Sequence, residues 1–212
     1  MKTILFQGDS ITDAIRPRDG DGYLGSGYAF LVAADLGKRY GSELRVLNRG
    51  ISGNRIVDLY ARIKADLINL KPDVLSILIG INDVWHEIGH GNGVSVEKYE
   101  RVYDWLLTEV KEALPEVRIL ILEPFVLQGH ATEATEEKPE RWEFFRTQTP
   151  LYAAAAKRLA EKHGTTFVPL QHLFDEACKL AEPAYWLHDG VHPTAMGHEL
   201  IAREWMKAFR QE

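Results

Sequence analysis

The sequence predicts an α/β fold with three layers, in which a five-stranded parallel sheet lies between two layers of helices. Three observations support this. Five short apolar runs, rich in β-branched residues, recur along the 212 residues; amphipathic patterns lie between the runs; and the two kinds of segment alternate. Because helical crossovers join parallel strands with a right-handed turn, this alternation is typical of a sheet covered on both faces.

The strands are expected at apolar runs that mostly lack alternating polar residues. These runs are residues 3–6, 44–47, 74–79, 117–122 and 165–168. A strand with solvent on one side alternates apolar and polar residues, whereas a strand of a doubly covered parallel sheet is apolar on both faces. We therefore expect all five strands to be buried.

Helices are expected between these strands and after the last one. Two apolar stripes have spacings of three and four residues and predict helices that bury one face. The first stripe is Tyr60, Ile63, Leu67 and Leu70, and the second is Tyr99, Val102, Leu106, Val110 and Ala113. Further helices are expected at residues 28–40, 149–163 and 195–209.

The segment 124–148 is the one long stretch without a regular pattern. It is charged at residues 133–138 and carries Trp142, Phe144 and Phe145. Irregular stretches of this length in a compact domain are often lids or interfaces. We expect this segment to cover the site or to contact a second subunit.

Composition limits the classes of protein to which the chain can belong. With 45% hydrophobic residues, the chain suits one domain spanning residues 1–212. The formal net charge of -6 disfavours nucleic acid or an anionic membrane as the main partner. The first apolar run is too short for a secretory signal, and no transmembrane stretch follows. We therefore expect a soluble, cytoplasmic protein.

Polar residues gather where the predicted strands end, which is where open parallel sheets bind their ligands. Gly8, Asp9 and Ser10 follow the first run, residues 48–54 follow the second, and residues 80–83 follow the third. Residues 189–193 follow the fifth run after a short connector. We expect these four segments to meet at one edge of the sheet.

Three of these residues can form a unit for nucleophilic catalysis. The hydroxyl of Ser10 needs a base to take its proton, and His192 with Asp189 three residues earlier supplies an imidazole and a carboxylate that orients it. Asp9 and Asp13 also flank the serine, but we interpret them as structural carboxylates that bond loop groups. The Gly-x-Ser-x-Gly elbow of α/β-hydrolases is absent, which indicates a different hydrolase fold.

The four segments resemble, in order, the four sequence blocks of the SGNH or GDSL hydrolase superfamily, and the resemblance extends over nearly the whole chain. It implies a flavodoxin-like fold, Ser10 as nucleophile, His192 as base and Asp189 as its orienting carboxylate. It also implies an oxyanion hole made by the N–H groups of Ser10 and Gly53 and the side-chain amide of Asn82. No cofactor is implied, and no metal.

Within that superfamily, residues 50–54, 79–85 and 191–193 are most similar to short intracellular bacterial esterases that deacetylate acetylxylan or xylo-oligosaccharides. This resemblance implies a serine esterase for small acetyl esters of sugars, and a homo-oligomer. A lysophospholipase or thioesterase of the same superfamily is the nearest alternative. A sugar-binding protein without catalytic activity is another.

A zinc metallopeptidase is the alternative from a different class. Residues 86–90 spell the H-E-x-x-H signature, in which His86 and His90 bind zinc when they share one face of a helix. Gly89 lies inside this segment, and glycine costs about 1 kcal/mol in a helix interior. We therefore expect a surface loop here and no zinc site.

Four residues beside these segments are candidate substrate contacts: Asp9, Arg55, Trp85 and Trp186. The two tryptophans, together with Tyr185, are suited to stacking on a sugar ring, although aromatic residues are more often part of a core. Arg55 is equally well explained as a salt-bridged surface residue. With Tyr23, His86 and His188, these aromatic residues predict an aromatic and polar mouth for the site.

Overall fold

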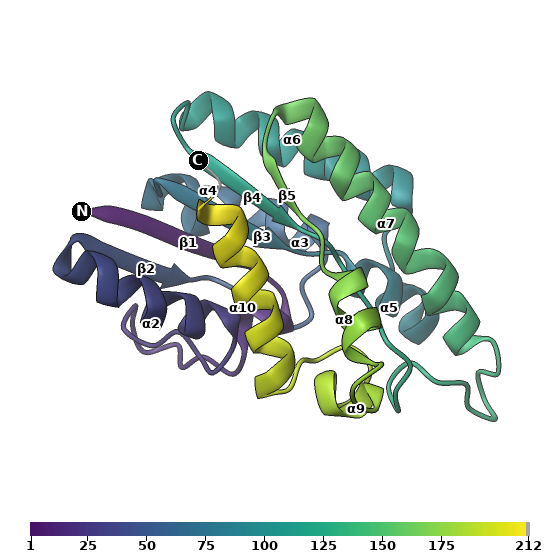
Figure 1. The fold of residues 1–212 in the computed structure, drawn as a ribbon. Coiled ribbons are helices and arrows are strands. Elements are labelled where there is room, and N and C mark those ends of the chain that lie inside the picture. Colours follow the sequence, from purple (N-terminus) through teal and green to yellow (C-terminus); the bar gives the residue numbers. More distant parts are fainter. Residues whose placement is uncertain (211–212) are drawn as a thin grey trace.

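The computed structural model describes residues 1–210, which form a five-stranded sheet with helices on both faces (Figure 1). All strand pairs are parallel, and the strand order is β2-β1-β3-β4-β5. The strands are β1 (Lys2–Gly8), β2 (Leu44–Asn48), β3 (Val74–Leu78), β4 (Arg118–Leu122) and β5 (Thr166–Val168). The predicted fold class is confirmed, and each strand lies within two residues of its predicted bounds.

The carboxyl ends of β1 and β3 lie level with one another, and β2 ends two residues earlier, opposite Phe6 of β1. Phe6 of β1 pairs with Asn48 of β2, and Gly8 of β1 pairs with Leu78 of β3. The chain leaves β1 toward β2 on one side and later returns to β3 on the other. This reversal opens a crevice at the ends of the strands, where open α/β sheets bind ligands.

Helices cover both faces of the sheet (Figure 1). α2 packs with α10 on one face, whereas α6 packs with α3 and α7 on the other, and α5 packs with α7. The helices are α1 (Ser10–Asp13), α2 (Tyr28–Tyr40), α3 (Ile56–Ala61), α4 (Ile63–Asp66), α5 (Ile81–His90), α6 (Val96–Ala113), α7 (Arg141–His163), α8 (Gln171–Ala177), α9 (Pro183–Trp186) and α10 (Ala195–Arg210), with short 3₁₀ helices η1 (Gly41–Glu43) and η2 (Ile68–Leu70). The first predicted stripe is thus divided among α3, α4 and η2.

The core between β1 and the α2/α10 layer is aromatic. Phe6, Tyr28 and Trp205 are fully buried, and the Phe6 ring lies 5.5 Å from Tyr28 and 5.4 Å from Trp205 between centroids. The indole N–H of Trp205 donates to the hydroxyl of Ser76 at 3.0 Å, so the one polar group of that side chain is satisfied. This packing fixes α10, and the loop before it, against the sheet.

The loop predicted for residues 86–90 is wrong, because α5 runs from Ile81 to His90. The helix buries Ile81 and Val84, with Ile88 partly buried against the same core. Burial of such side chains contributes about 1.5–3 kcal/mol each. That gain exceeds the cost of about 1 kcal/mol for Gly89 in the helix.

The predicted long loop is also shorter than expected. α7 begins at Arg141, eight residues before the predicted start, and the helix carries Pro150 in its interior. Phe145 is fully buried, and Trp142 and Phe144 pack against the core. Phe145 is therefore part of this chain's own core, whereas Trp142 and Phe144 are half-buried against that core.

Among residues 1–210, no helix combines the length and the apolar character that a membrane crossing needs.

Candidate active site

Ser10, His192 and Asp189 form an unbroken sequence of hydrogen bonds. Ser10 begins α1 directly after β1, and its Oγ lies 2.8 Å from Nε2 of His192. Nδ1 of His192 lies 2.6 Å from Oδ2 of Asp189. The imidazole therefore stands between a hydroxyl and a carboxylate, each bonded to a different ring nitrogen.

Backbone groups hold the Asp189 carboxylate in place. Its Oδ1 accepts from the N–H groups of Val191 at 2.9 Å and of His192 at 2.7 Å. Burial on its own would raise the pKa of this carboxyl, but the His192 ring and these two N–H groups lower it well below its usual range. Asp189 is therefore ionised at neutral pH and leaves Oδ2 to the imidazole.

The environment favours a proton on His192. The hydrogen bond to Asp189 raises the pKa of the imidazole above its ordinary value, against the opposing effect of burial. The charges of Asp189 and, more weakly, Asp9 act in the same direction. An imidazole of this kind accepts a proton readily from a neighbouring hydroxyl.

The turn that contains Gly53 lies beside the start of α1. The N–H of Ile51 donates to the carbonyl of Gly8 at 3.0 Å, which brings residues 50–53 alongside the end of β1. Gly53 has a φ of 82°, which a side chain would disfavour. Asn82 lies in the first turn of α5, after β3, and its Nδ2 donates to the carbonyl of Asn54 at 3.2 Å. One of the two amide hydrogens of Asn82 is thus used to hold the Gly53 turn.

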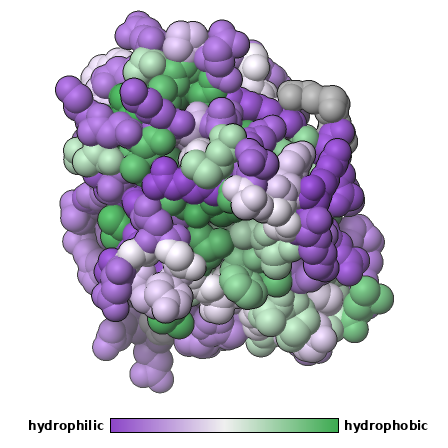
Figure 2. All heavy atoms as spheres, turned by 90° about the vertical axis from the view of Figure 1, so that its left-hand side faces the viewer, coloured by the Kyte–Doolittle hydropathy of each residue, from purple (hydrophilic) through white to green (hydrophobic). Residues whose placement is uncertain are grey.

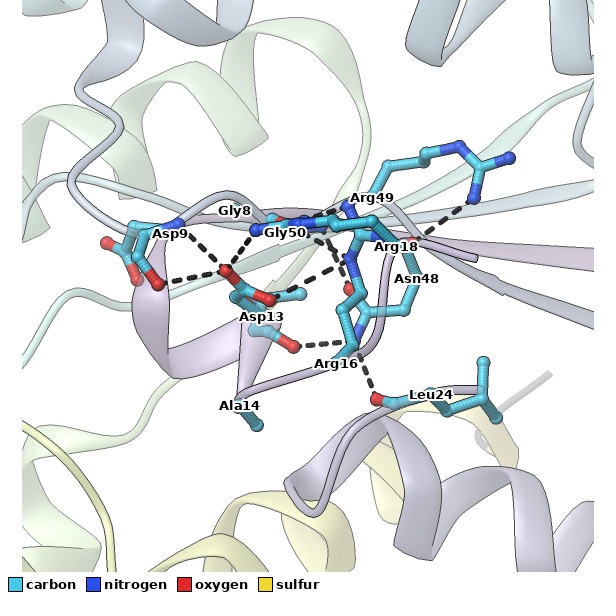
Figure 3. A network of polar contacts seen from close by, with 12 residues as sticks. Gly8, Asp9, Asp13, Ala14, Arg16, Arg18, Leu24, Asn48, Arg49 and Gly50 are labelled. Carbon is cyan, nitrogen blue, oxygen red and sulfur yellow. Dashed lines mark hydrogen bonds and ion pairs between the residues drawn. The ribbon is translucent and has the colours of Figure 1, made fainter. Parts of the chain in front are cut away.

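A partly buried polar network joins the loop after β1 to the loop after β2 (Figure 3). Arg16 and Arg18 both donate to the carbonyl of Gly50, at 3.0–3.1 Å. The Asp13 carboxylate accepts from Arg18 at 2.7 Å, and from the N–H and hydroxyl of Ser52 at 3.0 Å and 2.9 Å. A Cβ on Gly50 would lie 2.4 Å from the backbone nitrogen of Asp13, so only glycine allows this close approach.

A pocket of about 390 Å³ opens beside Ser10 and His192. Its polar lining consists of serine and histidine side chains, and its apolar lining is mostly small. The lining residues are Ser10, Ile11, Ala14, Ile15, Ser26, Ser52, His188, His192, Pro193, Ala195 and His198. Of the residues predicted for an aromatic and polar mouth, His188 lines this pocket, and Tyr23, Trp85, His86, Tyr185 and Trp186 do not.

Three of the four candidate substrate contacts have partners within the chain. Asp9 is 1% exposed, and its Oδ1 accepts from the N–H of Ile11 at 3.0 Å, which fits the structural role. Nε and Nη2 of Arg55 donate hydrogen bonds to the Asp58 carboxylate, and Nη1 donates to the carbonyl of Asn92. Trp85 is half-buried, and its ring lies 5.9 Å from the rings of both Phe145 and His192.

Trp186, the fourth candidate, belongs to α9 and packs edge-on against Tyr185 with 4.9 Å between ring centroids. Its indole nitrogen is buried without a hydrogen-bond partner. Like Trp85 it packs partly against the core, and a role in substrate binding stays a prediction.

The H-E-x-x-H segment has the helical geometry of a zinc motif but not its ligand set. On α5 the rings of His86 and His90 lie 6.1 Å apart. Catalytic zinc needs a third protein ligand. Among residues 1–210, the one group of three ligand-type side chains lies elsewhere, at His188, Asp189 and His192.

Several contacts of the site could not be found in the sequence. The bonds from Ser52 to Asp13 join residues 39 positions apart, and the N–H of Ile56 donates to the buried carboxylate of Asp83 from 27 positions away. His198 lines the pocket from α10, and its Nδ1 accepts from the N–H of Tyr28. Neither spacing nor periodicity signals such pairs, because each depends on the packing of separate helices.

A serine hydroxyl bonded through imidazole to a carboxylate, at the carboxyl edge of a parallel α/β sheet, is the arrangement of serine hydrolases. A profile of the GDSL-like lipase/acylhydrolase family matches residues 6–200. The chain belongs to this family and is a carboxylic ester hydrolase. The resemblance to SGNH and GDSL hydrolases is thereby confirmed.

Known relatives resemble the whole chain. It is 38% identical over 214 residues to an acetylxylan esterase of Geobacillus stearothermophilus, with 96% of this chain and 92% of the relative covered. The crystal structure of Axe2, an acetylxylan esterase of the same organism, matches with a TM-score of 0.82 and 36% identity, covering 100% of this chain and 95% of Axe2. A GDSL-like lipase structure from Parabacteroides merdae matches with a TM-score of 0.89 and 41% identity, covering 98% and 94% of the two chains.

Solved variants of Axe2 include catalytic mutants in which a serine, an aspartate or a histidine is replaced by alanine. The aspartate and histidine of Axe2 are three residues apart, as are Asp189 and His192 in this chain. Another variant shows that a tryptophan stands directly before the aspartate in Axe2. The residue before Asp189 in this chain is His188.

Proposed function

We propose that this protein is a serine acetylesterase that removes acetyl groups from xylo-oligosaccharides or related small sugars, with Ser10, His192 and Asp189 as its catalytic residues. The observation that carries the proposal is the hydrogen-bonded sequence from Ser10 Oγ through His192 to Asp189 at the wall of a pocket. The relatives named as acetylxylan esterases supply the substrate class.

The reaction begins with proton transfer. Nε2 of His192 takes the proton of Ser10 as Oγ attacks the ester carbonyl, and Asp189 holds the resulting imidazolium in place. The carbonyl oxygen becomes an oxyanion, which accepts hydrogen bonds from the N–H groups of Ser10 and Gly53 and from the free hydrogen of the Asn82 amide. His192 then gives its proton to the leaving sugar oxygen.

The second half of the reaction releases the acid. Water gives a proton to His192 and attacks the acetyl group on Ser10, through a second oxyanion held by the same donors. Collapse of this intermediate returns the proton to Ser10 and frees acetate. The pocket of about 390 Å³, with its small apolar lining, suits an acetyl group and one sugar residue.

A panel of substrates tests the proposal: p-nitrophenyl esters of acetate and of octanoate, together with acetylated xylo-oligosaccharides. We expect the highest kcat/KM with acetyl esters, and release of acetate from the sugars. The Ser10→Ala variant is the control for hydrolysis by contaminants. If octanoyl esters are hydrolysed with equal or higher kcat/KM, the lysophospholipase or thioesterase alternative replaces this proposal.

A homo-oligomer and a cytoplasmic location remain predictions. Phe145 of α7 is buried in this chain and does not support an interface, whereas Trp142 and Phe144 are half-buried and keep part of their surface exposed. Ile15, Tyr23 and Phe30 are exposed and line a groove of about 580 Å³. On the face shown in Figure 2, apolar patches interrupt a largely hydrophilic surface. Light scattering of the purified protein gives the oligomeric state, and a mass of one chain would exclude an oligomer.

A further inference from the structure

His188 is a third ionisable side chain beside the Asp189–His192 pair, and the proposed reaction does not use it. Its ring stacks on that of His192, with 5.8 Å between centroids and 24° between planes. Its Nε2 lies 3.9 Å from Oδ2 of Asp189, the same oxygen that is bonded to Nδ1 of His192. One carboxylate oxygen thus faces two imidazoles.

The loop itself holds the two histidines together. The N–H of His188 donates to the carbonyl of His192 at 3.0 Å, and Leu187 forms a β-bridge with Pro193. The segment from 187 to 193 is therefore a closed loop that returns to its starting point. The positions of both rings and of the carboxylate are set by this loop, before any ligand binds.

The separations of these atoms suit a transition-metal ion. One ligand atom from each of His188, Asp189 and His192 lies within 4.8 Å of the other two. Zinc binds imidazole nitrogen and carboxylate oxygen at about 2.0–2.2 Å, so its tetrahedral ligands lie roughly 3.4 Å apart. Oδ2 of Asp189 lies 2.6 Å from Nδ1 of His192 and 3.9 Å from Nε2 of His188, and these two distances lie on either side of that value.

Access to this group is open on the side of His188. The His188 side chain is 58% exposed and that of His192 is 30% exposed, and both line the pocket beside Ser10. Asp189 is only 9% exposed and is ionised, so it contributes a fixed negative charge beside a nitrogen of each ring. Two imidazoles and a carboxylate with a fourth position open to water form a common zinc ligand set.

We propose that His188, Asp189 and His192 form an inhibitory site for a divalent transition-metal ion such as Zn²⁺, and that occupancy of this site reversibly stops hydrolysis. The inhibitory part of this inference rests on the proposed role of His192 as base. The ion binds the lone pair of Nδ1 of the neutral His192 imidazole, so one nitrogen–metal bond forms and the single ring proton moves from Nδ1 to Nε2. Nε2 then carries that proton and cannot accept the proton of Ser10.

His188 distinguishes this chain from Axe2. Axe2 has a tryptophan directly before its catalytic aspartate, and an indole offers no lone pair to a metal ion. The substitution His188→Trp therefore introduces the residue of the relative while removing one of the three ligands. The variant His188→Gln removes the imidazole with a smaller change of shape.

Binding is measured by calorimetric titration of zinc into the wild type and into Ser10→Ala, which retains all three ligands but has lost the nucleophile. We expect one ion per chain with equal affinity in both proteins. His188→Gln and His188→Trp should each bind at least about tenfold more weakly, since removal of even an outer partner of a metal ligand costs about 10- to 100-fold in affinity.

The matched control is His90→Gln, because His86 and His90 are another pair of neighbouring histidines, 6.1 Å apart on α5. We expect its zinc affinity to equal that of the wild type. Loss of binding in His90→Gln, with binding retained in His188→Gln, would assign the ion to α5 and overturn the inference. Absence of zinc binding by the wild type would overturn it as well.

Inhibition is measured separately, with p-nitrophenyl acetate, zinc and then excess EDTA. We expect zinc to inhibit the wild type at the concentration at which it binds, EDTA to restore the rate, and both His188 variants to resist zinc relative to their own zinc-free rates. Binding through His188 without inhibition would keep the metal site but overturn its inhibitory role. A wild type that binds zinc but hydrolyses no ester would refute the proposed function alone.

Discussion

The Asp13 carboxylate accepts hydrogen bonds from both the N–H and the hydroxyl of Ser52, and so ties the helix that begins with Ser10 to the turn that contains Gly53. Asp13 is 3% exposed, and Arg18 holds the same carboxylate oxygen. The nucleophile and a proposed oxyanion donor are therefore positioned by one side chain that touches neither the substrate nor the reacting atoms.

We predict that Asp13→Asn lowers kcat by about 10- to 100-fold while KM changes little, because a small displacement of a catalytic donor is enough to cause such a loss. Asp21→Asn is the control, since Asp21 pairs with Arg45 and Arg49 but has no contact with Ser52. Circular dichroism checks the fold of both variants. An unchanged kcat in Asp13→Asn would show that the Gly53 turn holds its place without this bond.

Removal of the proton-transfer unit should abolish hydrolysis. We predict that Ser10→Ala and His192→Ala each lose nearly all esterase activity and stay folded, and that Asp189→Asn loses somewhat less. The measurement is kcat/KM for p-nitrophenyl acetate, with melting curves as the control for folding. If Ser10→Ala kept more than about a tenth of the wild-type turnover, Ser10 would not be the nucleophile.

Loss of one hydrogen-bond donor from an oxyanion hole lowers kcat by a characteristic factor. We predict that Asn82→Ala lowers kcat on the order of 10²- to 10³-fold. The Asn82 amide also donates to the carbonyl of Asn54. The single variant thus removes a donor and loosens the Gly53 turn, and Asn82→Asp, which keeps the size but lacks the N–H, should be at least as impaired. A loss smaller than tenfold in both variants would exclude Asn82 from the oxyanion hole.

The pH profile should follow the raised pKa of His192. Only the neutral imidazole accepts a proton, so activity is low in acid and rises as His192 loses its proton, with a midpoint above its ordinary pKa of about 6.5. Asp9 favours the proton on His192 only where this buried carboxyl is itself ionised, so Asp9→Asn should move the midpoint slightly to lower pH. The measurement is kcat/KM against pH, and a flat profile from about pH 5 to 8 would exclude a histidine base.

Asp9 should also make stability depend on pH. Burial raises the pKa of Asp9 from 3.8 to about 7, so the folded state favours the protonated form. The contribution of this carboxyl to the free energy of unfolding is fully present below pH 3.8 and is lost as pH rises through 7. The total loss is on the order of 4 kcal/mol. We predict that Asp9→Asn, which cannot ionise, has a higher Tm than the wild type at pH 8, and that the difference shrinks toward pH 5. The exposed Asp19→Asn is the control, and equal Tm differences at both pH values would contradict the prediction.

The sequence predicted most of the fold because the signals are local. Apolar runs without polar alternation marked all five strands. β1, β3 and β4 are buried almost throughout, but the expectation that all five strands are buried is wrong for the edge strands β2 and β5, which are partly exposed because each has a neighbour on one side alone. The boundaries of β1, β2 and β3 were enough to predict that the polar segments after these strands lie at one edge of the sheet. Ser10, Asp189 and His192 could be assigned to one site because nucleophilic catalysis by serine needs a hydroxyl, a base and a carboxylate together.

The errors arose where burial outweighed a local preference. Gly89 disfavours a helix, yet α5 forms because Ile81 and Val84 are buried. Pro150 is best tolerated in the first turn of a helix, which suggests a start near residue 149, yet α7 begins at Arg141 because Phe145 and its neighbours are buried upstream. The proximity of His188 to Asp189 was visible in the sequence, but the stacking of its ring on His192 depends on the bond between His188 N–H and the His192 carbonyl.

Ser10 and His192, which share a hydrogen bond, stand 182 positions apart in the chain. Contacts between such distant residues form late, because the entropy of closing so long a loop opposes them. During refolding from denaturant, we expect helix content to return before hydrolysis does. The esterase reaction is therefore a probe for the last step of folding, in which the two ends of the polypeptide meet.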